Sequence, residues 1–135
     1  MGEIKKISNQ SDFTVSYIKM EQMDRDYGRI NPNDTKLNVN MWFPWVEEVR
    51  EFTKKVIIVE VLTKVRIFFW ESGDYVYYSM SKQNLDGPYD SKSNIDFLGD
   101  EYFSGKIAPG GKTKGRKELE IRNDGDDITF KLYDC

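Results

Sequence analysis

The chain has no histidine and only one cysteine among its 135 residues. The missing histidine excludes serine-histidine-aspartate and cysteine-histidine catalysis and histidine-ligated zinc, and it removes the commonest general base. A single cysteine, Cys135, excludes an intrachain disulfide and a thiolate zinc site within one chain, although it could link two chains. We interpret this thiol as an exposed bystander in a reducing compartment.

Long apolar runs are also missing, because the longest one without a charge is Val56 to Val59. We therefore predict no transmembrane segment. The first residues, MGEIKKISNQ, contain lysines with no apolar stretch behind them, so no signal peptide is predicted and we expect a cytoplasmic or otherwise leaderless protein. The net charge of −3 does not favour nucleic acid or an anionic membrane surface as a partner.

No cofactor or metal motif is complete. Residues 105–113, GKIAPGGKT, resemble a phosphate-binding loop, but the first glycine lies one residue too far from Gly111-Lys112-Thr113. Neither Asp24/Asp26 nor the acidic run 124–127 follows the calcium-loop pattern. Carboxylates within residues 86–101 could serve glycoside hydrolysis, but a solvated acidic loop is the simpler interpretation. We predict no cofactor, no metal and no enzyme activity, with catalysis as the third alternative.

The sequence does contain repeated alternation of apolar and polar residues, which is typical of half-buried strands. One domain, residues 1–135, fits the length. A cluster of turn formers, residues 9–12, separates the first two predicted strands, and residues 82–117 lack periodicity. Strands or hairpins are predicted at Ile4 to Ser8, Phe13 to Met20, Lys36 to Trp42, Val56 to Leu62, Val65 to Ser81 and Lys117 to Asp134. The fold class is therefore all-β, an antiparallel β-sandwich or flattened barrel of about 8–9 strands.

The predicted hairpin from Val65 to Ser81 organises the rest of the chain. With Ser72-Gly73 as a two-residue loop, Phe69 faces Val76 on an apolar side, and Trp70 faces Tyr75 on an aromatic side. Because side chains alternate with period two, a slip of one residue would turn Arg66 inward, so the alternation favours this register. The same pairing rule with an Asp124-Gly125 turn predicts the second hairpin.

The second hairpin and the remaining segments complete the expected layout. Its predicted pairs are Ile121 with Ile128 on the apolar face and Arg122 with Asp127 on the wet face. In the strand predicted from Lys36 to Trp42, Leu37, Val39 and Met41 point inward while Asn38, Asn40 and Trp42 point outward. Pro44 ends that strand, and a helical turn follows over Val46 to Phe52. Thr63-Lys64 leaves two alternatives open, a tight hairpin or one long bent strand.

Short pieces of the chain resemble a known family. The segments ISNQSDFTV (residues 7–15) and FFWES (residues 68–72), in an acidic all-β domain of this size, are similar to aegerolysins, which are lipid-binding β-sandwich proteins. The resemblance covers scattered pieces and no diagnostic motif, so it assigns no family.

Aromatic residues form the candidate site, because alternation does not place them all in one core. Three explanations stay open: a second sheet or the Pro44-Trp45 loop covers them, they form a subunit interface, or they form a ligand platform. We predict a non-catalytic binding module that recognises a carbohydrate or lipid head group. The alternative is a structural protein that self-associates as a homo-oligomer through the same face. The predicted binding residues are Trp42, Trp45, Phe68, Trp70, Tyr75 and Tyr77.

Overall fold

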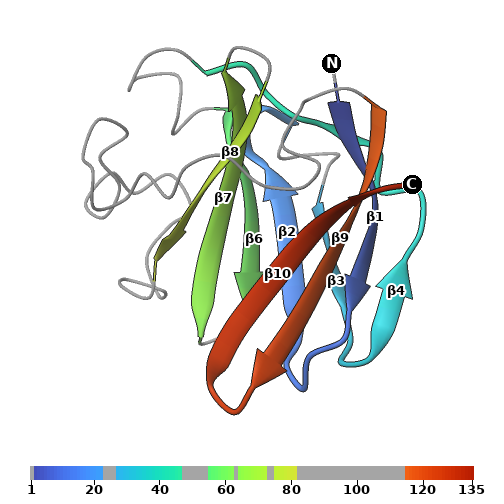
Figure 1. The fold of residues 1–135 in the computed structure, drawn as a ribbon, viewed down its shortest axis with the longest axis vertical. Coiled ribbons are helices and arrows are strands. Elements are labelled where there is room, and N and C mark those ends of the chain that lie inside the picture. Colours follow the sequence, from blue (N-terminus) through green and yellow to red (C-terminus); the bar gives the residue numbers. More distant parts are fainter. Residues whose placement is uncertain (1, 23–26, 47–54, 63, 73–74, 82–114) are drawn as a thin grey trace.

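The computed structural model describes residues 2–22, 27–46, 55–62, 64–72, 75–81 and 115–135, and it consists of two packed β-sheets (Figure 1). The predicted all-β sandwich is confirmed. Sheet A contains β1 (Gly2–Asn9), β4 (Asp34–Lys36), β5 (Met41–Trp42), β9 (Gly115–Asp124) and β10 (Asp127–Asp134). Sheet B contains β2 (Val15–Lys19), β3 (Tyr27–Ile30), β6 (Ile57–Val61), β7 (Val65–Ser72) and β8 (Tyr75–Ser81). A short 3-10 helix, η1 (Met20–Gln22), follows β2.

The two sheets differ in the direction of their strand pairs. Sheet B runs β3-β2-β6-β7-β8 with antiparallel pairs throughout. Sheet A runs β10-β9-β1-β4, with β5 also paired to β1, and its β1–β9 pair is parallel. The prediction of a purely antiparallel sandwich is wrong for this pair. It joins strands that lie far apart in the chain, and local patterns carry no signal for such a contact.

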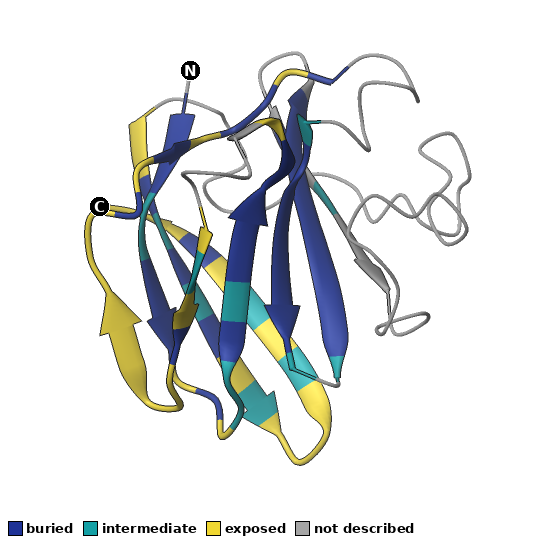
Figure 2. Cartoon of the chain, turned by 180° about the vertical axis from the view of Figure 1, so that it is seen from behind, coloured by how far each residue is buried: buried dark blue, intermediate teal, exposed yellow. Residues whose placement is uncertain are grey.

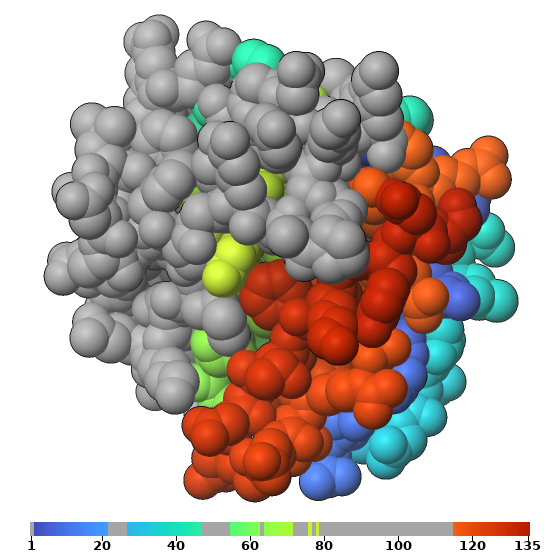
Figure 3. Space-filling view, in the orientation of Figure 1, coloured from blue at the N-terminus to red at the C-terminus, as the bar shows by residue number. Residues whose placement is uncertain are grey.

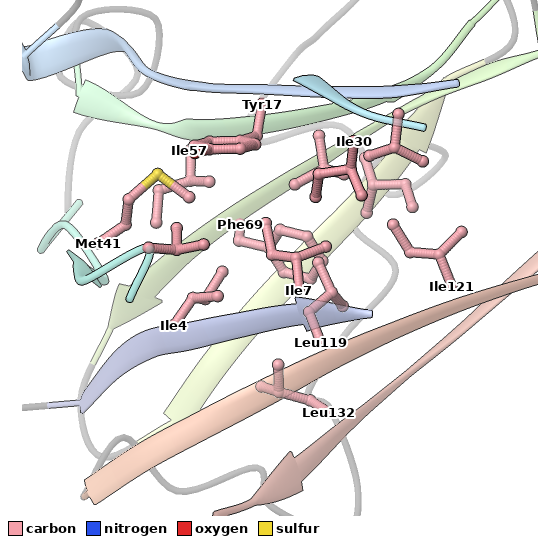
Figure 4. Close-up of a cluster of buried hydrophobic side chains, with 14 of the residues drawn as sticks. Ile4, Ile7, Tyr17, Ile30, Met41, Ile57, Phe69, Leu119, Ile121 and Leu132 are labelled. Carbon is pink, nitrogen blue, oxygen red and sulfur yellow. The ribbon is translucent and has the colours of Figure 1, made fainter. Parts of the chain in front are cut away.

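The main core fills the space between the sheets (Figure 4). Ile4 and Ile7 of β1 both belong to this core together with Ile57 of β6, although they are three residues apart, because the register of β1 shifts between Ile4 and Lys6. At the β8 and β10 edges, the Phe130 ring packs edge-on against Phe69 and Tyr78, with ring centroids 5.4 Å and 5.0 Å apart. Figure 2 shows the result as buried colour along β6 and β7 and exposed colour on β4.

A second buried cluster lies on the opposite face of sheet B. Its members are Ile18, Met20, Val46, Val56, Ile58, Phe68 and Trp70. The apolar run predicted for Val56 to Leu62 therefore has its expected cause, because β6 is a central strand with both faces buried.

Both predicted hairpins form, but each register is displaced by two residues. Phe69 lies opposite Tyr78 instead of Val76, and Trp70 lies opposite Tyr77 instead of Tyr75. In the second hairpin, Ile121 lies opposite Phe130 instead of Ile128. A displacement of two keeps every side chain on its predicted face, so alternation could not detect it.

Turn chemistry explains the displacement in the second hairpin. Asp124 pairs with Asp127, which makes Gly125-Asp126 the loop. Gly125 has a φ of +61° and Asp126 has no positive φ, as in a type II′ turn with glycine first rather than the type I′ turn expected for Asp-Gly. Arg122 consequently donates to Glu120 of its own strand at 2.5 Å, and this hydrogen bond raises the pKa of the exposed guanidinium. Figure 3 shows the β9–β10 hairpin on the molecular surface.

The strand predicted from Lys36 to Trp42 is split into β4 and β5. Asn38 and Asn40 have φ values of 58° and 56°, in the left-handed region that asparagine tolerates better than most residues. Leu37 was predicted to point inward and is instead exposed, whereas Val39 and Met41 are buried as predicted.

Of the two alternatives left open at Thr63-Lys64, a tight hairpin or one long bent strand, the structure has the tight hairpin. Val61 of β6 lies opposite Val65 of β7, and Lys64 N donates to Val61 O at 2.9 Å. The helical turn expected over Val46 to Phe52 lies outside the described residues beyond Val46, as does the irregular region up to residue 114. Gly115–Lys117, expected to be irregular, belong to β9.

Gly28 of β3 provides a packing prediction. It lies opposite Tyr17 of β2, and a Cβ at position 28 would lie 2.6 Å from Tyr17 Oη and 2.8 Å from Cζ. We expect Gly28→Ala to lower the free energy of unfolding by about 1–3 kcal/mol, because the buried Tyr17 ring must shift. Urea unfolding measures this. The loss of unfolding free energy caused by Gly28→Ala should be smaller in a protein that also carries Tyr17→Leu. An equal loss with and without Tyr17→Leu would contradict the steric explanation.

Candidate functional site

The candidate site is built around residues 41–46, which we call the crossing segment because it passes from sheet A to sheet B (Figure 1). On the sheet A side, Phe43 N donates to Gly2 O at 3.0 Å. On the sheet B side, Glu71 N donates to Pro44 O at 2.8 Å and Val46 N donates to Glu71 O at 3.0 Å. The segment is thus fixed at both ends by backbone hydrogen bonds.

Side chains of the crossing segment divide into anchors and exposed rings. Phe43 is buried in the main core and Val46 in the second cluster. Trp42 and Trp45 keep 47% and 41% of their surface exposed. Exposed tryptophan is unusual on a surface with no partner, and here the backbone on either side of both indoles is held in place.

A pocket of about 260 Å³ lies beside the two indoles, where β2 ends and β6 is about to begin. Its described lining combines the aromatic crossing segment with charged side chains from sheet B. These lining residues are Lys19, Glu21, Trp42, Phe43, Pro44, Trp45 and Lys55. Aromatic walls with a few polar groups are typical of sites that bind small polar ligands.

Lys19 lines this pocket with only 6% of its residue surface exposed, and its Nζ is not among the described buried atoms that lack a hydrogen-bond partner, so the ammonium is accessible in the pocket. It is the last residue of β2 and lies opposite Ile57 of the main core, so its side chain points to the inner face of sheet B. Within the described parts of the chain, no hydrogen bond or ion pair joins the Lys19 ammonium to another residue. Glu21, the acidic lining residue, is exposed.

The structure separates the predicted aromatic site residues into groups. Trp42 and Trp45 share the pocket, whereas Phe68 and Trp70 are 4% and 1% exposed in the second cluster. Tyr75 and Tyr77 belong to β8, but their side chains lie outside the described residues. Val46 and Val56 pack with Phe68 and Trp70 in that cluster, and Val46 directly follows the Pro44-Trp45 loop of the first explanation.

Sequence reasoning did not include Lys19 in the site. The sequence contained a signal, because alternation along the strand predicted from Phe13 to Met20 places Lys19 on the same face as Val15 and Tyr17. A lysine on the apolar face of a strand indicates either a partner or an opening at the strand end.

Comparisons with known proteins found no match for this chain among family models, curated proteins or solved structures. Function must therefore be argued from the site itself. Among the residues with described placement, no helix is long and apolar enough to cross a membrane, and no cluster of acidic or cysteine side chains has the arrangement of a metal site.

Proposed function

We propose that this protein is a non-catalytic binding module that holds a carbohydrate or lipid head group in the pocket beside Trp42 and Trp45. The observation that carries the proposal is the pair of exposed indoles lining one pocket together with charged side chains. An indole offers a flat apolar surface to the C–H face of a sugar or to an acyl chain. Lysine and glutamate side chains offer hydrogen bonds to hydroxyl or head-group atoms.

The rigid attachment of the crossing segment also supports this proposal. Backbone hydrogen bonds to Gly2 and Glu71, with Phe43 and Val46 buried, fix the indoles before a ligand arrives. A preorganised site loses less conformational entropy on binding, so modest contacts yield measurable affinity.

Replacing either exposed tryptophan tests the proposal. We expect Trp42→Ala and Trp45→Ala each to weaken binding about tenfold or more, because truncating a tryptophan anchor costs about 2 kcal/mol. A glycan array and vesicle flotation find the ligand, and titration calorimetry measures its affinity. Tyr133→Ala removes another exposed aromatic, far from the pocket lining, and should bind as the wild type does. Equal binding by all three variants contradicts the proposal.

Self-association through the same two indoles is the second candidate, and their exposure supports it as well. It predicts an elution mass above the monomer's 15.9 kDa and indoles shielded from acrylamide quenching. A ligand platform predicts a monomer in which Trp42 and Trp45 are quenched while the buried Trp70 is not. Measuring mass and quenching together therefore separates the two candidates.

A further inference from the structure

We propose that the pocket selects ligands with an anionic group, a phosphate, sulfate or carboxylate on a polyhydroxylated ring, and that Lys19 is the residue that recognises it. This inference rests on the proposed function, since it names the ligand class of the same pocket. It begins from a lysine whose stem is packed at the end of β2 while its ammonium opens into the pocket.

The stem of Lys19 is buried while its ammonium remains accessible to solvent. Lysine commonly buries its methylene stem against apolar surface and keeps the charged end in water. Lys19 is 6% exposed and forms no ion pair with a described residue, and its Nζ is not among the described buried atoms that lack a hydrogen-bond partner, so the ammonium opens into the pocket that Lys19 lines. A hydrophobic residue would suit the end of β2 better for stability alone, because its neighbours Tyr17 and Ile57 belong to the main core.

The arrangement of charge in the pocket points to an anion. The described lining carries two lysines and one glutamate. Glu21 is exposed and lies beyond ion-pair distance of Lys19, so it does not neutralise the Lys19 ammonium. A charge-assisted hydrogen bond from Lys19 to an anionic oxygen would give this ammonium a partner beside the indoles.

The indoles define the rest of the ligand. Trp42 and Trp45 line the same pocket as Lys19, so one ligand can place an anionic substituent on the ammonium and a ring face on an indole. Acidic sugars in glycans and inositol phosphates in lipid head groups share this chemistry. The experiment below distinguishes these two sources.

The test compares neutral ligands with anionic counterparts. Lactose, sialyllactose and sulfated lactose are titrated into the protein by calorimetry, and vesicles of phosphatidylcholine are compared with vesicles that also contain phosphatidylinositol phosphate. We expect at least one anionic probe to bind about tenfold or more tightly than its neutral parent, which is about 1.4 kcal/mol. Binding to the sugars alone, or to the vesicles alone, identifies the source.

Variants of Lys19 assign the preference to that residue. Lys19→Met keeps the length of the side chain and should reduce the anionic probe to the affinity of the neutral one, whereas Lys19→Arg should retain a preference. Lys36→Met removes an exposed lysine of β4 and serves as the matched control. Because residue 19 lies beside Tyr17 and Ile57 of the main core, the apolar side chain of Lys19→Met should keep or raise the melting temperature of the wild type, which separates lost recognition from misfolding.

Three outcomes decide between the proposals. Equal affinity for neutral and anionic probes overturns the role of Lys19 while leaving the binding module intact. A preference for anions that survives in Lys19→Met also overturns it. Absence of binding to every glycan on the array and to both kinds of vesicle overturns the proposed function, and this inference with it.

Discussion

We expect Arg66→Met to lower the free energy of unfolding by about 3–5 kcal/mol, because it leaves the buried Glu60 without its counter-ion. Arg66 Nε donates to Glu60 Oε2 at 2.9 Å, and the two side chains are only 8% and 10% exposed. The pair lies directly across the central strands β6 and β7 of sheet B. Chemical denaturation with guanidinium chloride provides the measurement.

A double variant separates the cost of an unpaired charge from the worth of the pair. Glu60→Leu combined with Arg66→Met replaces both charges by apolar side chains, and we expect it to be far more stable than Arg66→Met alone. Arg122→Met is the matched surface control, since the arginine of the Arg122–Glu120 pair is 60% exposed, and we expect it to change the free energy of unfolding far less than Arg66→Met does. If the double variant is no more stable than Arg66→Met, the unpaired Glu60 is not the cause of the stability lost in Arg66→Met.

The second large effect is expected at Asn9, whose side chain is fully buried where β1 ends. Its Nδ2 lies 2.7 Å from Phe13 O, 3.2 Å from Ile30 O and 3.1 Å from Asn31 O. Its Oδ1 accepts hydrogen bonds from Ser11 N and Ser11 Oγ at 3.1 Å and 2.6 Å. One amide thereby ties the end of β1 in sheet A to the end of β3 in sheet B.

Asn9→Ala should lower the free energy of unfolding by about 2–4 kcal/mol, because it leaves several buried polar groups without a partner. Asn9→Asp keeps the acceptor for Ser11 but turns a carboxylate oxygen toward the three carbonyls, so it should be at least as destabilising. Asn123→Ala removes a half-buried asparagine whose hydrogen bond to Asp12 is exposed, and this control should cost about 1 kcal/mol or less. Comparable losses in Asn9→Ala and Asn123→Ala would contradict a special role for Asn9.

Much of the fold could be predicted because apolar alternation determines which face of a strand is buried. Val15 and Tyr17 reach the core as predicted, and the run ending at Leu62 contains a central strand. Alternation determines faces but not registers, so both hairpins could be displaced by two residues without any change of pattern. Turn type decided the register, and Asp124-Gly125-Asp126 allows two turns, one beginning at aspartate and one at glycine.

The candidate site could be predicted only in part, for a related reason. Trp42 was assigned outward by alternation and is exposed, and Trp45 is exposed beside it. Phe68 and Trp70 were assigned to a face that needed a partner, and Val46 and Val56 pack with them. Which residues cover a face is a property of tertiary packing, and strand periodicity contains no information about it. Strand periodicity could not predict the pocket either, because Lys19 and Trp42 belong to different sheets.

Because β1 pairs in parallel with β9, which is distant in the chain, we expect sheet A to be completed later than the β6–β8 part of sheet B. Strands β6, β7 and β8 are successive neighbours in sheet B, so their contacts close short loops. Contacts such as Ile4 with Lys117 close a very long loop, which slows folding because its entropy is lost before the contact is made. On the ribosome, Phe69 stays uncovered until Phe130 has been synthesised. Until the β9–β10 hairpin emerges, the part of the sheet B face that Phe130 covers in the folded protein stays exposed to solvent.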